Sequence, residues 1–297
     1  MLTFSTEFIS GPARLRVDVH GAKERTQLLD DLTFLNYRLA SIQLANTVQS
    51  TTPHIVWYED EPQKNLLLED DCLILKGDWY EGEIQKILVS LLAMELDKAG
   101  LHPFHSSGVR YKNTTIMFLG GENNHGKTMC QIEGARRKGQ VISTETMVIN
   151  DHGWVVQGSK TIFMRKRAKG TERSDLADQD EGVAKFFDKV PEVTFFEGES
   201  NVDLCIMPAI DGHFLTQTNK MGLFESEYHS YHSMMNFMGL NQLVSPGLVM
   251  PIIDSDERRR ARAEFCHRWA EARPFYMVRA ATPQIIFDEV EKILDTM

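Results

Sequence analysis

The chain has 297 residues, 42% of them hydrophobic, which is enough for a sizeable buried core and for two domains. Acidic residues outnumber basic ones by 42 to 32, and the formal charge of −10 argues against partners such as nucleic-acid phosphates or an anionic membrane surface. With no apolar run near the roughly 20 residues of a membrane span, no leader-like N-terminus and no paired cysteines, we expect a globular, cytoplasmic protein with neither a nucleic-acid nor a membrane partner.

Residues 1–100 predict an N-terminal α+β portion. The spacing of leucines over Thr26 to Ala45 favours a helix, and the apolar residues from Glu81 to Leu96 follow the helical period until Gly100 provides a stop signal. Short apolar runs in the same portion predict three strands: Leu15 to Val19, Ile55 to Tyr58, and Cys72 to Leu75. We place the boundary with a second domain, residues 101–297, at Gly100.

The second domain begins with a β–α–β pattern. Thr115 to Leu119 is rich in β-branched and aromatic residues, as is typical of a buried strand, and Gly120-Gly121 follows it directly. Lys127 to Arg137 predicts a helix, and Gln140 to Ile142 predicts the next strand. This order places a glycine-rich turn between a buried strand and a helix.

The remaining elements are predicted by shorter patterns. The highly charged stretch from Glu172 to Lys189 indicates an exposed insertion. Apolar runs predict three strands and a closing amphipathic helix: Thr161 to Met164, Val202 to Met207, Phe275 to Arg279, and Pro283 to Leu294.

The glycine-rich turn carries the strongest functional signal. Residues 121–128, Gly-Glu-Asn-Asn-His-Gly-Lys-Thr, match the phosphate-binding pattern GxxxxGK[ST], and they lie between a strand and a helix as that pattern requires. The bland alternative is a glycine-rich hairpin with an incidental Gly-Lys-Thr. We expect the loop to bind ATP through Gly121, Asn123, Asn124, His125, Gly126, Lys127 and Thr128. We expect the hydroxyl of Thr128 to bind Mg²⁺ as well. We also expect Lys127 to be exposed, and His125 either contacts the nucleotide or points outward.

A carboxylate follows at the end of the next strand. Glu145 lies in Ser-Thr-Glu-Thr, where it would be beside the γ-phosphate and the metal. There it could accept the proton of an attacking hydroxyl or bind Mg²⁺, and the alternative is a solvated side chain at a strand end.

These segments together resemble a known family. The stretch Leu101-His-Pro-Phe-His-Ser-Ser-Gly-Val109, the phosphate loop, and Arg137-Lys-Gly-Gln-Val-Ile-Ser-Thr-Glu145 resemble the catalytic domain of HPr kinase/phosphorylase. That family shares its fold with phosphoenolpyruvate carboxykinase. The likeness is close from Leu101 to Glu145 and looser to the C-terminus, and it implies an α/β fold with a P-loop core.

The resemblance also implies roles for individual residues. His105 matches a histidine that precedes the loop, Lys127 and Thr128 match the phosphate lysine and the metal hydroxyl, and Glu145 matches the first of two acidic positions. Thr146 departs from the family, which usually has a second carboxylate there. The segment by which the family binds the protein HPr is not recognisable, so HPr is a poor substrate candidate.

Independently of the family, the topology predicts where His105 lies. A strand from His105, a tight turn near Lys112-Asn113 and a return as Thr115 to Leu119 would bring His105 beside Gly120. The alternative is a histidine that only satisfies backbone groups at the start of the strand.

Other polar clusters offer weaker candidates. Arg165, or else Arg167, could stabilise the charge of a transferred phosphoryl group. His229 and His232 offer two imidazoles on a possible helix but no third metal ligand, and the nearby segment Met234 to Met238 could belong to an acceptor pocket or to an ordinary helical core. Two further groups are read as structural: His102, and a solvated, salt-bridged face formed by Arg258, Arg259, Arg260 and Arg262.

These observations predict an ATP-dependent, Mg²⁺-dependent kinase with four catalytic residues: Glu145, His105, Lys127 and Arg165. The expected acceptor is a hydroxyl of a small-molecule metabolite or biosynthetic intermediate. Two alternatives stay open: a peptide or protein serine kinase of a modification pathway, and a nucleotide-binding regulatory module without turnover. Self-association into a homo-oligomer, the choice between ATP and GTP, and the role of the N-terminal portion are also left open.

Overall fold

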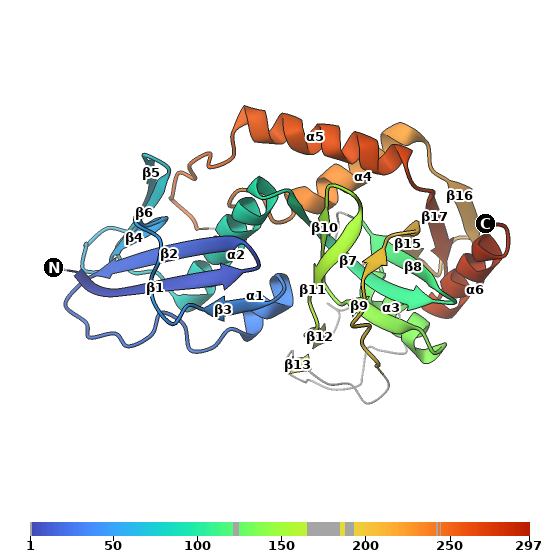
Figure 1. Ribbon diagram of the computed structural model, residues 1–297, viewed down its shortest axis with the longest axis horizontal. Coiled ribbons are helices and arrows are strands. Elements are labelled where there is room, and N and C mark those ends of the chain that lie inside the picture. The colour runs from blue at the N-terminus through green and yellow to red at the C-terminus, as the bar shows by residue number, and fades with distance from the viewer. Residues whose placement is uncertain (1, 121–124, 165–184, 188–192, 242, 244) are drawn as a thin grey trace.

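The computed structural model describes residues 2–120, 125–164, 185–187, 193–241, 243 and 245–297. Over these residues the chain is a mixed α/β protein with six helices and two large mixed sheets, one on either side of Figure 1. A third, two-stranded sheet pairs β12 (Ile162–Met164) with β13 (Lys185–Phe187). Within the described residues, no helix is both long enough and apolar enough to cross a membrane.

The first sheet is built from the first 76 residues. Its strand order is β3-β1-β2-β4-β6-β5, with parallel pairing along β2-β4-β6 and antiparallel pairing elsewhere. The strands are β1 (Leu2–Ser10), β2 (Ala13–His20), β3 (Ile42–Leu44), β4 (Ile55–Tyr58), β5 (Asn65–Glu69) and β6 (Cys72–Lys76). The three predicted strands are confirmed to within two residues at each end.

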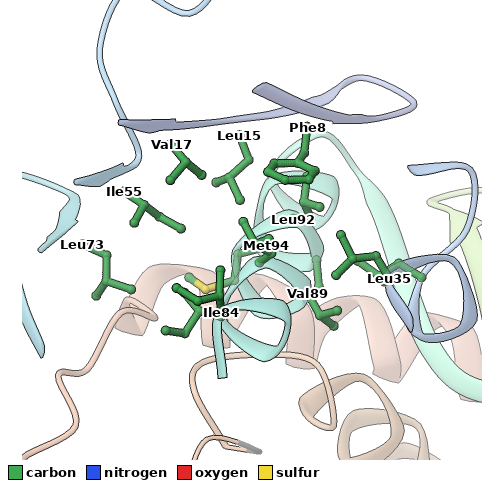
Figure 2. Packing of buried hydrophobic residues seen from close by; sticks show 14 of the residues in the cluster. Phe8, Leu15, Val17, Leu35, Ile55, Leu73, Ile84, Val89, Leu92 and Met94 are labelled. Atoms are coloured by element: carbon green, nitrogen blue, oxygen red, sulfur yellow. The ribbon is translucent and has the colours of Figure 1, made fainter. Parts of the chain in front are cut away.

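Helix α2 (Glu81–Lys98) forms where the apolar period from Glu81 predicted a helix, and it covers one face of this sheet. Figure 2 shows Phe8, Leu15 and Val17 of β1 and β2 directed at side chains of α2, such as Leu92. All are almost fully buried, so removal of apolar surface from water holds the helix on the sheet. Val148 of β10, in the other sheet, belongs to the same core, which therefore joins the two parts of the chain.

The helix expected over Thr26 to Ala45 is much shorter than predicted. Only α1 (Thr33–Arg38) is helical, and the chain then turns back to form β3 beside β1. The Asn36 side chain accepts a hydrogen bond from the backbone N–H of Ile42 and donates one to its carbonyl. Asparagine competes in this way with helical backbone bonding, and Ser41 adopts a positive φ of 57° at the turn.

The second sheet begins at Leu101. Its order is β14-β11-β10-β7-β8-β15-β17-β16, and β9 also pairs with β7. The strands are β7 (Leu101–Tyr111), β8 (Thr114–Leu119), β9 (Gln140–Ser143), β10 (Thr146–Asn150), β11 (Trp154–Gly158), β14 (Ser200–Asn201), β15 (Leu204–Ile210), β16 (Gln217–Lys220) and β17 (Phe275–Ala280). The strand predicted at Val202 to Met207 begins two residues later and runs to Ile210.

The two faces of this sheet carry separate cores. On one face, α3 (Lys127–Arg136) and α6 (Pro283–Leu294) pack over side chains such as Ile116 and Phe118. On the other, α4 (Leu223–Met235) and α5 (Asp256–Glu271) pack over their strand neighbours Met117 and Leu119. The alternation of β8 side chains between the two cores is that of a strand buried on both faces.

The prediction of a solvated arginine face on α5 is wrong for Arg262. Its side chain is fully buried and forms ion pairs with Asp97 of α2 at 2.9 Å and with Asp254 at 3.0 Å. His102 also binds Asp97, at 2.8 Å, in keeping with its predicted structural role. A buried guanidinium requires such partners. In Figure 1, α5 runs from above the first sheet to the second sheet, where β17 follows it, and Arg262 joins it to α2.

Candidate functional site

The candidate site lies at one edge of the second sheet, where several strands end together. Strands β8 and β9 are both antiparallel to β7, so they run in the same direction and end at the same edge. β15 runs parallel to β8 and ends there too. The phosphate loop follows β8 and Glu145 follows β9, as the β–α–β pattern predicted. Ligands of α/β proteins commonly bind at the carboxyl ends of parallel strands.

The described part of the phosphate loop enters α3 sharply. Gly126 has a φ of 104°, a conformation that side chains rarely adopt, and a Cβ added there would lie 2.5 Å from Ile210. The backbone N–H of Ile210 donates to the His125 carbonyl at 3.3 Å, which ties the loop to the end of β15. The helix then begins at Lys127, so its first N–H groups face the loop.

Lys127 is buried, which corrects the expectation that it would be exposed. Its ammonium group donates to the Gly120 carbonyl at 3.0 Å, and its own carbonyl accepts from Ser107 Oγ at 2.9 Å. The lysine therefore spans the loop from the end of β8 to the start of α3. The adjacent Thr128 is half-buried at the same helix end.

The predicted hairpin places His105 beside the loop. Its neighbour Ser106 pairs with Leu119 across the antiparallel strands, and Lys112 and Asn113 form the turn with positive φ. The imidazole Nε2 lies 3.2 Å from Oε1 of Glu145. Burial lowers the pKa of His105, and Lys127 and Arg38 lower it further against the opposing effect of Glu145. A neutral imidazole carries its one proton on the nitrogen that contacts a carboxylate, which in His105 is Nε2.

Glu145 is held in place through its backbone. The amides of Glu145 and Thr146 both donate to the Ser159 hydroxyl at 2.9 Å, and the Glu145 carbonyl accepts from Ser106 at 3.0 Å. The Thr144 hydroxyl donates to the backbone carbonyls of Ser159 and Thr161. The carboxylate is thus presented from a rigid connection between β9 and β10.

The N-terminal portion contributes an arginine to the Glu145 carboxylate. Arg38, the last residue of α1, donates Nη1 to Glu145 Oε1 and Nη2 to Asn236 at 2.9 Å. Its guanidinium lies 5.0 Å from the centre of the Phe237 ring. Asn236 and Phe237 belong to the segment Met234 to Met238, for which an acceptor pocket was one of two expectations.

The neighbouring side chains determine the charge of Glu145. Burial alone would raise its pKa, but His105, Arg38 and Lys127 lower the pKa to about 2. The carboxyl group is therefore ionised throughout the physiological range. An ionised carboxylate can bind a divalent cation or accept a proton.

The residues at this edge fit a nucleotide with Mg²⁺. A left-handed glycine, a helix N-terminus and a lysine converge on one loop, and two buried nitrogens, Arg38 Nε and His105 Nδ1, have no hydrogen-bond partner. Among the described residues, no three acidic, histidine or cysteine side chains gather to hold a metal, and His229 and His232 are no exception. Mg²⁺ usually takes few protein ligands and completes its shell with phosphates and water.

Several predicted site residues cannot be placed. Gly121, Asn123, Asn124 and Arg165 lie outside the described residues, as do Arg167 and most of the insertion predicted from Glu172 to Lys189. Of the residues that are described, Lys127, His105 and Glu145 come together, with Thr128 at the adjoining helix end.

Sequence reasoning missed Arg38 and Ser159, and it named Asn236 only as part of the segment Met234 to Met238. None lies near the phosphate loop in sequence, and none belongs to a recognisable motif. Only the cluster at Asn236 gave a signal, through its unusual mixture of polar and methionine residues.

Comparison with known proteins adds no assignment to this geometry. No protein-family model matches the chain, and no curated protein shows significant similarity to it.

Proposed function

We propose that the protein is an ATP-dependent kinase that transfers the γ-phosphoryl group to a hydroxyl of a small-molecule metabolite or biosynthetic intermediate. The observation that carries the proposal is the contact between Glu145 and His105 at the sheet edge where Lys127 opens α3. It joins a carboxylate to a phosphate-binding loop, and these are the two parts that phosphoryl transfer to a hydroxyl requires.

Each residue has a defined task in this reaction. The amides of the loop and Lys127 bind the phosphates, while Thr128 and Glu145 hold Mg²⁺, which neutralises charge on the phosphates when it is bound. The acceptor oxygen forms a bond to the γ-phosphorus as the bond to the bridging oxygen breaks. ADP leaves with that electron pair, and the acceptor proton passes to Glu145.

The low pKa of Glu145 is compatible with this role. Phosphoryl transfer has a loose transition state, so positioning and charge neutralisation contribute more than the strength of the base. His105 keeps the carboxylate oriented through its Nε2 proton. The acceptor would lie beside Asn236 and Phe237, the residues of the 234–238 segment that reach this carboxylate through Arg38.

One observation favours a nucleotide-binding module without turnover as a second candidate. The carboxylate of Glu145 is already paired with Arg38, and a paired carboxylate of low pKa is a weak proton acceptor. Such a module would bind MgATP through the same loop and leave it intact. Measurement of turnover separates the two candidates.

The test is a screen with ATP labelled at the γ-phosphate, against hydroxylated metabolites and serine-containing peptides. We expect label on a small hydroxylated compound with the wild type and almost none with Glu145→Gln. Glu133→Gln is the matched control, because Glu133 is also buried and paired with an arginine, at 3.0 Å, but lies outside the site. Label on peptides would favour the protein-kinase alternative. Tight MgATP binding with no transfer would favour the module and contradict the kinase.

A further inference from the structure

One arginine reaches the candidate site from outside the domain that carries the phosphate loop. The Arg38 carbonyl accepts a hydrogen bond from Thr146 Oγ1 of β10 at 2.5 Å. Two residues later, the Ala40 carbonyl accepts from Ser10 Oγ, which also lies 3.3 Å from Gln157 of β11. In Figure 1, α1 lies on the side of the N-terminal portion that faces β10 and β11. The backbone that carries Arg38 is therefore anchored to the second sheet.

The side chain of Arg38 is fixed as firmly as its backbone. One Nη binds Glu145, the other binds Asn236, and the guanidinium lies against the Phe237 ring. More than nine-tenths of the side chain is buried. Because the guanidinium is a rigid planar fork, these contacts determine where the Glu145 carboxylate can lie.

A purely structural ion pair is the simpler explanation, and Arg262 shows what such a pair looks like in this chain. All three nitrogens of Arg262 donate to the carboxylates of two aspartates. Arg38 differs, because its Nε is buried with no hydrogen-bond partner, and the same is true of Nδ1 of His105. Both nitrogens belong to side chains that hold Glu145. Buried polar groups without partners are rare in structural cores and are often found at functional sites.

The charged groups around Glu145 also favour a functional role for Arg38. Arg38 and Lys127 both act electrostatically on the single carboxylate of Glu145, while burial disfavours a charge on His105. Two cations facing one anion leave an excess of positive charge at the edge that the phosphate loop occupies. Such an excess suits a polyphosphate ligand better than it suits the interior of a stable core.

We propose that Arg38 is a positioning residue for phosphoryl transfer, which holds the Glu145 carboxylate towards the acceptor hydroxyl so that the N-terminal portion completes the active site. This inference rests on the proposed kinase function. It gives the first 100 residues a role that the phosphate-loop domain cannot supply, because the arginine comes from α1.

The test compares three variants of the full chain: Arg38→Met, Arg38→Lys and Arg262→Met. Arg262→Met is the matched control, since it also removes a buried guanidinium that joins the N-terminal portion to the rest of the chain, but one whose ion-pair partners are Asp97 and Asp254 rather than Glu145. For each variant, the thermal unfolding midpoint, the KM for MgATP and the kcat with the acceptor found in the screen are measured. Water serves as the acceptor if only ATP hydrolysis is found.

For Arg38→Met we expect kcat to fall about 10² to 10³-fold, as after loss of one preorganised hydrogen-bond donor, while the KM for MgATP changes less than about threefold. Arg38→Lys keeps the positive charge but not the planar guanidinium, so its kcat should be about a tenth of the wild-type kcat. Arg262→Met should lower the unfolding midpoint at least as much as Arg38→Met and leave kcat within about threefold of the wild type.

Two results would overturn the inference about Arg38 and leave the proposed kinase function intact. One is a folded Arg38→Met with kcat within about threefold of an active wild type, and the other is an equal loss of kcat in Arg262→Met. A wild type that binds MgATP but transfers phosphate neither to an acceptor nor to water would overturn the proposed function as well. The two failures are therefore distinguishable.

Discussion

Arg38, at the end of helix α1, donates a hydrogen bond to the Glu145 carboxylate, which lies 107 positions further along the chain. The contact joins the N-terminal portion to the edge of the second sheet where the phosphate loop begins. Both side chains are at least nine-tenths buried. The candidate site is therefore formed by two parts of the chain, and its properties should depend on residues from each.

Lys127→Ala should abolish nucleotide-dependent turnover and weaken MgATP binding while the protein stays folded. The ammonium group that would contact the β- and γ-phosphates is lost, and because the side chain is buried the free energy of unfolding should fall without loss of the fold. Turnover and calorimetric titration with MgATP check the result. Lys160→Ala is the control, because Lys160 also donates to backbone carbonyls, at 3.0 and 3.1 Å. Unchanged turnover in a folded Lys127→Ala protein would rule out the phosphate-binding role.

Glu145→Gln should reduce turnover by about 10² to 10⁴-fold, because the substitution keeps the size of the side chain and removes the proton acceptor. MgATP affinity should change much less, since the loop and Lys127 are intact. Steady-state kinetics at saturating MgATP provide the measurement. A loss smaller than about threefold would place the base elsewhere and would contradict the role that the family resemblance implies for this position.

Ser159→Ala should destabilise the protein by about 1 to 3 kcal/mol, because the hydroxyl accepts hydrogen bonds from two buried amides that would then lack a partner. Turnover should fall about tenfold as Glu145 loses its fixed backbone. Chemical denaturation and kinetics report the two effects. Ser226→Ala removes another buried serine hydroxyl, on α4, and should leave turnover unchanged. A normal turnover in Ser159→Ala would show that this backbone support is dispensable.

The fold was predictable where local pattern and tertiary structure agree. The strand-to-helix connection at Gly126, the hairpin that carries His105 and the closing helix all follow from short-range signals, such as the positive-φ turn at Lys112 and Asn113. The long helix predicted from Thr26 failed because Asn36 bonds to Ile42 and turns the chain into β3.

The site was predictable only where its contacts depend on spacing along the chain. Lys127 and Glu145 are linked by one β–α–β unit, so their proximity follows from spacing. Arg38 reaches Glu145 because the end of α1 lies against β10 of the second sheet, and nothing near Arg38 in sequence signals that contact. Arg262 was misread for the same reason, because the buried aspartate that receives it comes from α2.

The ion pair between Arg262 and Asp97 predicts how stability depends on pH. Burial would raise the pKa of Asp97, but its bonds to His102 and Arg262 hold the pKa below the ordinary value of 3.8. A carboxyl group with a lowered pKa in the folded state stabilises the protein above its unfolded pKa and loses that effect as pH falls through the folded value. Asp97→Asn should therefore be less stable than the wild type at pH 7, and the difference should shrink below about pH 4.

Urea denaturation at pH values from 7 to 3 measures this difference. The control is Asp256→Asn, because Asp256 is a highly exposed partner of Arg259 and its removal should cost little at any pH. A difference between Asp97→Asn and the wild type that stays constant down to pH 3 would contradict the assignment.

A structure of the protein with Mg²⁺ and a non-hydrolysable ATP analogue tests the central claim most directly. The account predicts the triphosphate at the N-terminus of α3, with Mg²⁺ at Thr128 and with the γ-phosphorus within about 8 Å of the His105 imidazole, a distance that allows one bridging water. Glu145 should face the γ-phosphate from the same side. A nucleotide bound elsewhere, or a γ-phosphate beyond that distance from His105 and Glu145, would contradict the claim that these residues form a phosphoryl-transfer site.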